Sequence, residues 1–154
     1  TPVYFIKGQP IQHITIGQPM RLLVATLPHA TPTYITVGDV AKLYSNNPTR
    51  IGGIFKTIGQ LVEWARQALL EGDMVVLGQL MQANQYHLQT LTVSDQMLDT
   101  LCDAALDAGA LGAKLSGGGR GGNMIALVTP ERETYVQEAL LANGAQRVIP
   151  TTLQ

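Results

Sequence analysis

The spacing of apolar residues changes along this chain and predicts two kinds of element. Two short runs rich in β-branched residues and leucine, at residues 3–6 and 20–26, are typical of strands. Between residues 33 and 109 the apolar residues recur every three or four positions instead, which predicts four helices. These are expected from Thr33 to about Asn46, from a cap at Thr49 to Gly72, from a cap at Asp73 to about Leu91, and from a cap at Ser94 to Gly109.

The last third of the chain returns to short apolar runs. We expect a strand that carries Lys114, then a glycine-rich loop, then a strand over residues 124–129 that Pro130 ends. A helix is expected from Pro130 to Asn143, followed by a final strand over residues 146–150. This order predicts an α+β fold, in which a small antiparallel sheet has helices packed on one face, as a single domain over residues 1–154.

Composition excludes several classes of function. The 154 residues are 45% hydrophobic and 14% charged, with a formal net charge of −1, which is typical of an ordered globular domain. Lys and Arg are scattered, which argues against a nucleic-acid-binding surface, and no apolar run is long enough to span a membrane. The single cysteine, Cys102, excludes an internal disulfide, is compatible with a reducing cytoplasm, and is expected to be a core residue.

No metal site is predicted. His13, His29 and His87 share none of the spacings that metal-binding histidines use. Asp103 and Asp107 lie four positions apart on an expected helix, but beside its apolar face. We interpret them as a solvated pair rather than as metal ligands.

The most informative segment holds five glycines within residues 117–122, between two apolar runs. Dense glycine allows positive φ and lets backbone N–H groups approach an anion such as phosphate. The segment satisfies G-x-G-x-x-G literally, but a short apolar strand follows it where a dinucleotide fold needs a helix. It also lacks the Lys-Ser or Lys-Thr pair of a P-loop. From these residues alone, a phosphate-binding loop and a long hairpin turn remain open.

Residues 109–127, with the sequence GALGAKLSGGGRGGNMIAL, resemble the third motif of the GHMP small-molecule kinases. Within that superfamily they most resemble the mevalonate kinase family. Residues 2–8, 16–25, 32–40 and 84–85 resemble further segments of that family, so the resemblance extends over nearly the whole chain.

This resemblance implies a ferredoxin-like C-terminal domain with extra helices. It also implies that the chain is the C-terminal half of a two-domain kinase, as the apolar strand that follows Thr1 almost at once suggests. The intact enzyme would use ATP and Mg²⁺ to phosphorylate mevalonate for isoprenoid precursor synthesis in the cytoplasm. The family's nucleotide-binding loop, Mg²⁺ ligands and catalytic Lys and Asp belong to the N-terminal half. We therefore expect no catalytic residue in this chain and no phosphate transfer by it alone; a homodimer stays open.

The resemblance assigns the glycine-rich loop to the phosphate or ATP cleft. Its candidate residues are Ser116, Gly117, Gly118, Gly119 and Arg120. Backbone N–H groups and the Ser116 hydroxyl would donate to phosphate oxygens. Arg120 could pair with a phosphate through its fork of donors, although a solvated arginine is slightly favoured.

Three further residues have two interpretations each. Thr33 corresponds to a threonine beside the substrate in the family, or is an ordinary helix N-cap. Lys114 is expected to be structural or on an outer face. Asn84, on an otherwise apolar stripe, either makes a hydrogen bond within the core, which is favoured, or faces the cleft.

The chain departs from the family pattern at three places. Asn123 replaces the usual cysteine and Gly118 the usual alanine, while residues 26–28 read Thr-Leu-Pro in place of Asp-Thr-Gly. The last departure lies near the substrate segment, so it leaves the acceptor alcohol open. The alternatives are another GHMP kinase, acting on phosphomevalonate, homoserine or a sugar, and a non-catalytic ferredoxin-like module that binds an anion or a partner.

Overall fold

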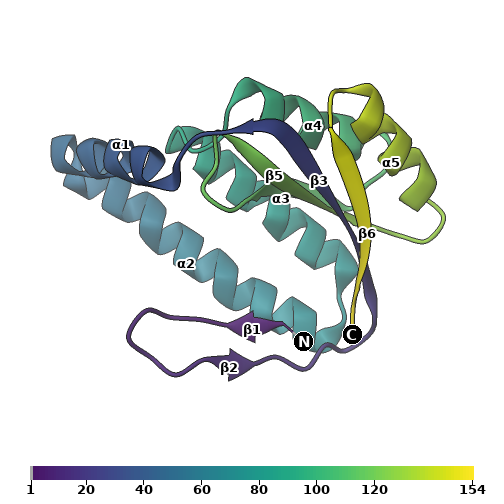
Figure 1. The fold of residues 1–154 in the computed structure, drawn as a ribbon. Helices are drawn as coiled ribbons and strands as arrows, with labels where there is room; N and C mark the ends of the chain where they lie inside the picture. The colour runs from purple at the N-terminus through teal and green to yellow at the C-terminus, as the bar shows by residue number, and fades with distance from the viewer. Residues whose placement is uncertain (1) are drawn as a thin grey trace.

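A computed structural model describes residues 2–154, which fold into helices on both sides of an antiparallel sheet (Figure 1). In chain order the elements are β1 (Val3–Tyr4), β2 (Gln12–His13), β3 (Met20–Ala30), α1 (Thr33–Asn46), α2 (Pro48–Glu71), α3 (Met74–Thr90), α4 (Gln96–Asp107), β4 (Gly112–Ser116), β5 (Gly121–Val128), α5 (Glu133–Ala142) and β6 (Arg147–Leu153). Among these described residues, no helix combines the length and the apolarity that crossing a membrane requires.

The main sheet has the strand order β4-β5-β3-β6, and every neighbouring pair is antiparallel. Four helices connect β3 to β4, and α5 connects β5 to β6. This is the β-α-β-β-α-β arrangement of a ferredoxin-like fold with extra helices in its first connection. The predicted α+β fold is confirmed. Strands β1 and β2 form a separate two-stranded ribbon beside α2 (Figure 1).

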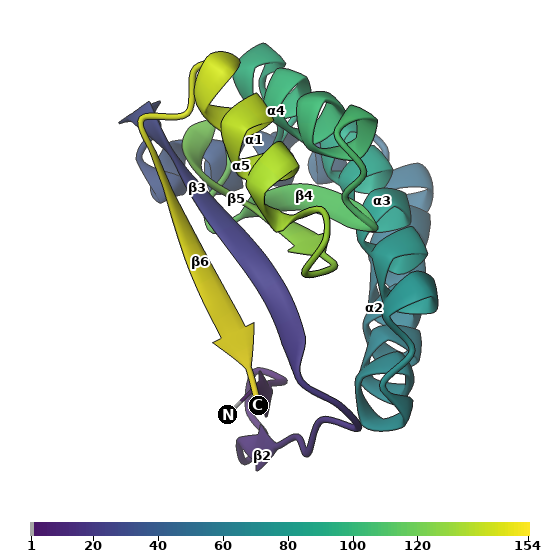
Figure 2. The same cartoon turned by 90° about the vertical axis from the view of Figure 1, so that its right-hand side faces the viewer.

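Side chains alternate between the two faces of the sheet, and each face has its own core. On β5, Met124 and Ala126 belong to the larger cluster, which includes Leu98 and Leu101 of α4. Leu127 points to the other face and joins a smaller cluster with residues of α2 and α3. Helices α4 and α5 therefore cover one face, while α2 and α3 lie along the other side (Figure 2). The helices thus pack on both faces of the sheet and not on one face as predicted, because the long first connection supplies a second apolar layer.

Strand β3 is four residues longer than the spacing of apolar residues predicts. It continues through Pro28 to Ala30, a region that the sequence assigns to a loop. The register between β3 and β5 shifts between Thr26 and Ala30, and β6 pairs with β3 only as far as Thr26. A proline is tolerated there because the irregular pairing requires no N–H donor from it.

Two predicted helix caps are correct and two are wrong. Gly72 ends α2 with a φ of +74°, and the Asp73 side chain accepts from the Val76 N–H at 2.9 Å. Helix α2 is capped by Asn47 rather than Thr49, because Pro48 occupies its first position. Helix α4 is capped by Asp95 rather than Ser94.

The last helix also begins later than predicted. Helix α5 starts at Glu133 rather than at Pro130. The N–H groups of Arg132 and Glu133 both donate to the Thr129 carbonyl, so a turn occupies the residues between the proline and the helix.

Candidate functional site

The glycine-rich loop between β4 and β5 meets the N-terminus of α1. A Cβ atom at Gly118 would lie 2.4 Å from Thr33 Oγ1, so the two elements are in direct contact. They enclose a pocket of about 250 Å³, lined by Thr33, Thr36, Val37, Val40, Val93, Gly117 and Gly118. Three of the residues that the sequence singles out, Thr33, Gly117 and Gly118, thus lie around one cavity, although they come from distant parts of the chain.

This junction is rich in unused N–H donors. Within residues 2–154, the N–H groups of Gly117, Gly118 and Gly119 donate to no backbone carbonyl outside the strand ladders. Helix α1 adds its N-terminus, where Pro32 provides no side-chain cap and the first turn contains no acidic residue. Because a helix N-terminus carries partial positive charge, both elements favour an anion here. The interpretation of Thr33 as an N-cap is wrong, because Pro32 occupies that position.

Backbone hydrogen bonds fix the far end of the loop from two sides. The Arg120 N–H donates to the Val93 carbonyl at 2.8 Å, and the Arg120 carbonyl accepts from the Thr31 N–H at 3.0 Å. The first bond joins the loop to the α3–α4 connection, and the second joins it to the segment before α1. Ser116 is the last residue of β4 and pairs with Asn123 of β5, so the loop begins directly after the last paired residue.

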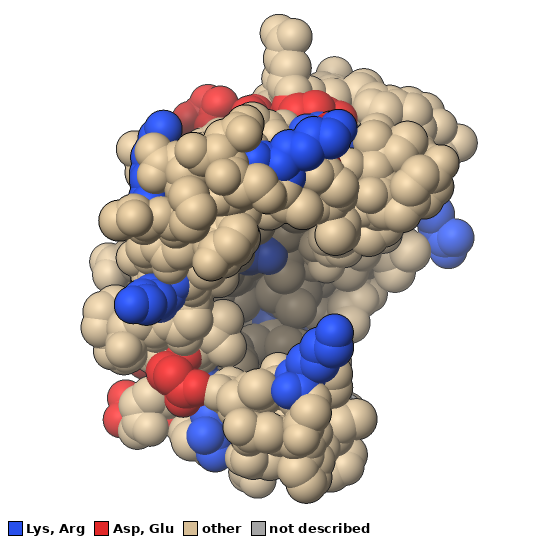
Figure 3. Space-filling view, turned by 90° about the vertical axis from the view of Figure 1, so that its left-hand side faces the viewer, with Lys and Arg blue, Asp and Glu red and all other residues tan. Residues whose placement is uncertain are grey.

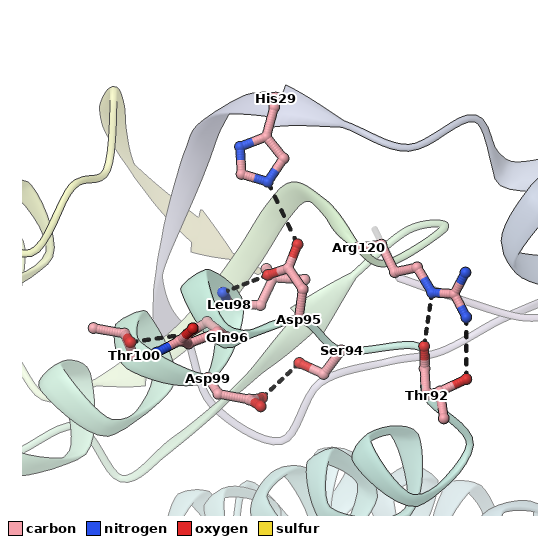
Figure 4. A network of polar contacts seen from close by, with 9 residues as sticks. All are labelled: His29, Thr92, Ser94, Asp95, Gln96, Leu98, Asp99, Thr100 and Arg120. Carbon is pink, nitrogen blue, oxygen red and sulfur yellow. Dashed lines mark hydrogen bonds and ion pairs between the residues drawn. The ribbon is translucent and has the colours of Figure 1, made fainter.

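The Arg120 guanidinium also holds the loop. It donates to Asp39 Oδ2 at 2.6 Å. It also donates to the Thr92 carbonyl and hydroxyl, at 2.9 and 3.1 Å (Figure 4). Both Arg120 and Thr92 have positive φ, of 50° and 59°, which costs energy in a residue with a Cβ. The interpretation of Arg120 as a solvated loop side chain is therefore wrong. Its contact with a phosphate stays a prediction.

We expect acid to release the contact between Asp39 and Arg120. The hydrogen bond from Arg120, then that from Lys42, lowers the pKa of the Asp39 carboxyl below its usual value of 3.8. A lowered pKa means that the ion pair stabilises the folded loop above pH 3.8, and that this contribution is lost as the pH falls through the lowered value. An NMR titration of the Arg120 Nη1–H signal, from the group that donates to Asp39, should show this transition, and Asp39→Asn should abolish it. An Nη1–H signal that titrates identically in both proteins would contradict the contact.

A buried glutamine supports the loop from behind. Gln85, which is only 6% exposed, accepts from the Leu115 N–H at 2.9 Å. Its Nε2 donates to Ser94 Oγ and Asp99 Oδ1. Ser94 in turn donates to Asp99, as Figure 4 shows. The hydrogen bond that the sequence favours for Asn84 is thus made by its neighbour. The sequence pattern did not single out Gln85, although the pair at residues 84–85 resembles a segment of the mevalonate kinase family.

Replacing this glutamine by an apolar residue of similar size should destabilise the protein. In Gln85→Met, the buried Leu115 N–H loses its acceptor, and we expect about 1–3 kcal/mol lower stability in urea denaturation. The control is Gln89→Met, at an exposed position of the same helix, with an expected change within about 0.5 kcal/mol. Equal stability of the two variants would show that the buried network contributes nothing.

A second pocket of about 200 Å³ lies between α2, α3 and β4. Its lining is Leu61, Val62, Ala65, Leu80, Met81, Asn84 and Lys114. Burial lowers the pKa of the Lys114 ammonium, whose Nζ donates to the Leu115 carbonyl at 2.6 Å. No carboxylate among residues 2–154 forms an ion pair with it. Lys114 is therefore not on an outer face, because its side chain lies within a largely apolar pocket.

The remaining candidates are structural or solvated. Cys102 is a core residue as expected, and burial raises the pKa of its thiol to about 12. His29 is exposed, and its Nε2 lies 3.4 Å from Asp95 Oδ2 (Figure 4). Over the described part of the chain, no three His, Cys, Asp or Glu side chains lie close enough together to hold a metal ion.

Comparison with known proteins gives these features a family. Residues 65–146 match the family described as GHMP kinases C terminal. The chain is 40% identical over 152 residues to a mevalonate kinase of Thermococcus onnurineus, covering 96% of this chain and 45% of that protein. A galactokinase of Thermococcus kodakarensis is 38% identical over 96 residues, which cover 62% of this chain and 27% of the relative.

A solved structure shows the same fold. The crystal structure of L. major mevalonate kinase in complex with R-mevalonate superposes with a TM-score of 0.92 at 31% identity, covering 99% of this chain and 48% of that one. The chain thus spans less than half the length of these relatives. Its family match covers more than half of its residues and includes the glycine-rich loop, so the chain belongs to the GHMP kinase C-terminal family.

Proposed function

We propose that residues 1–154 are the C-terminal half of an ATP-dependent kinase that phosphorylates mevalonate. The observation that carries this proposal is the pocket in which the glycine-rich loop faces Thr33 at the uncapped N-terminus of α1. The 40% identity to a mevalonate kinase over 152 residues supports mevalonate as the acceptor.

The chain's own residues would bind and orient the reactants. The N–H groups of Gly117, Gly118 and Gly119 are free to donate to phosphate oxygens, and Ser116 can add a hydroxyl. Thr33, at the opposite side of the pocket, is suited to contact the acceptor. Bound ATP would supply the phosphoryl group. In such transfers the protein contributes position and charge stabilisation rather than covalent chemistry.

The remaining parts are assigned to an N-terminal half. The family resemblance assigns the Mg²⁺ ligands to that half, and this assignment stays a prediction. Lys114, which forms no ion pair within residues 2–154, lines the pocket between α2, α3 and β4. Figure 3 shows a hollowed face with basic side chains on its rim and in its depth, which is suited to a negatively charged ligand. The domain pairing, a homodimer and a cytoplasmic location stay predictions.

The test is mevalonate-dependent ADP formation by the intact polypeptide that carries these residues. We expect turnover with mevalonate and none with residues 1–154 alone. Robust phosphorylation of mevalonate by residues 1–154 would contradict the division of labour, and an intact protein inactive on mevalonate would contradict the substrate.

A sugar is the second candidate acceptor. It is favoured by the 38% identity to a galactokinase, while the Thr-Leu-Pro sequence at residues 26–28 departs from the mevalonate kinase pattern. Assaying the intact protein with galactose, homoserine and phosphomevalonate beside mevalonate separates these acceptors by their ratios of kcat/KM.

A further inference from the structure

Thr36 carries the one buried side-chain polar atom that lacks a partner among residues 2–154. Its side chain is only 2% exposed, and its Oγ1 makes no hydrogen bond. A buried hydroxyl without a partner destabilises the folded state, because folding removes its hydrogen bonds to water and replaces them with none in the protein. Such an atom in an otherwise satisfied structure calls for an explanation.

Other hydroxyl side chains in the helices solve this problem locally. Ser45, Thr57, Thr90 and Thr100 each donate to the carbonyl four residues earlier, at 2.8–3.1 Å. The bond from Thr100 to Gln96 is visible in Figure 4. All four are at least partly exposed, whereas Thr36 is buried and does not make this bond. Its hydroxyl therefore has no hydrogen-bond partner at a buried position, where lacking one costs most.

Thr36 is among the residues that line the pocket between α1 and the glycine-rich loop. It lies one helical turn after Thr33, so both threonines face the same side of α1. The other side chains of the lining are Val37, Val40 and Val93, and the loop contributes Gly117 and Gly118. The part of the pocket that the valines and Thr36 line fits a short hydrocarbon that carries an oxygen, while the N–H donors lie on the side of the glycine-rich loop.

We propose that Thr36 is a specificity-determining residue, whose hydroxyl makes a hydrogen bond with an oxygen of the acceptor molecule bound in this pocket. This inference rests on the proposed kinase function and names a residue of the same site. A branched hydroxy acid such as mevalonate offers both parts that the pocket requires: a methyl group for the valines and an oxygen for Thr36. The uncapped α1 N-terminus and the loop N–H groups remain available to negatively charged oxygens.

The experiment compares Thr36→Val with Thr36→Ser and the wild type in the intact polypeptide. Valine keeps the shape and removes the hydroxyl, so we expect KM for mevalonate to rise about 3- to 10-fold, with kcat and KM for ATP nearly unchanged. Serine keeps the hydroxyl and should restore most of the affinity. The control is Thr57→Val, which removes an exposed hydroxyl of α2 that bonds within its own helix.

A second readout separates this role from a structural one. Removing a buried hydroxyl without a partner should leave the melting temperature of the unliganded protein unchanged, or raise it by about 2–4 °C. A Thr36→Val variant that melts lower and is not restored by serine would overturn the proposal, as would an unchanged KM for the acceptor or a raised KM for ATP alone. Wild-type turnover tests the proposed function separately: if another acceptor is preferred, the same comparison is made with that acceptor.

Discussion

Gly119→Ala is expected to abolish most of the activity of the intact enzyme and to destabilise this half of it. Gly119 has a φ of +77°, and a Cβ there would lie 2.1 Å from the Val93 carbonyl oxygen and 2.5 Å from Val93 Cγ1. The clash is with backbone, so it cannot be relieved by turning a side chain. The loop would have to move away from the α3–α4 connection and break the bond from the Arg120 N–H to Val93.

We expect two effects of this displacement. The strained φ and the clash together should lower the free energy of unfolding by about 2–4 kcal/mol in urea denaturation. Misplacing the loop N–H donors by an ångström should lower kcat/KM for mevalonate, the proposed substrate, by about 100-fold. A spectroscopic check of folding in the absence of urea shows whether the activity is lost from a folded protein.

Gly117→Ala is the matched control for this prediction. Gly117 also has a positive φ, +94°, but no heavy atom lies within 4 Å of the Cβ that alanine would add. It therefore carries only the cost of the backbone conformation, about 1–2 kcal/mol. If the two variants proved equally mild, the contact between the loop and Val93 would not be what holds the loop in place.

The sequence predicts the main elements because their signals are local. Helical spacing of apolar residues, Gly72 and Asp73 locate α2 and α3, and short apolar runs locate β4 and β5. The element boundaries that were predicted wrongly depend on strand pairing or on which of two neighbouring residues caps a helix. Strand β3 extends because β5 pairs with it as far as Ala30, and Asp95 rather than Ser94 caps α4 because the Ser94 hydroxyl bonds to Asp99.

The candidate site was only partly predictable for the same reason. Glycine density identifies the loop, and the family resemblance adds Thr33, but neither shows that Gly118 contacts Thr33. Asn84 and Gln85 are adjacent polar residues on one helix, and only the tertiary structure shows which of them faces β4. Thr36 gave no signal in the sequence, because an unsatisfied hydroxyl is defined by what surrounds it.

Gly78→Ala is expected to be the most destabilising glycine-to-alanine substitution in the helices of residues 2–154. A Cβ at Gly78 of α3 would lie 2.2 Å from the Leu111 carbonyl oxygen, and one at Gly112 of β4 would lie 2.4 Å from the Gly78 carbonyl oxygen. The helix and the strand thus touch backbone to backbone. Alanine would force them apart and strain the nearby bond between Gln85 and Leu115.

The expected sign is opposite to that of an ordinary glycine in a helix. Alanine gains about 1 kcal/mol of helix propensity, yet we expect Gly78→Ala to lose about 2–4 kcal/mol overall, because overpacking a backbone contact outweighs that gain. Gly59→Ala in α2 is the matched control, since no heavy atom lies within 4 Å of its added Cβ. It should stabilise the protein by about 0.5–1 kcal/mol. Urea denaturation of both variants measures these changes in stability. If Gly78→Ala were also stabilising, α3 and β4 could not be packed as closely as this contact requires. The way in which β4 positions Lys114 and the glycine-rich loop would then need another explanation.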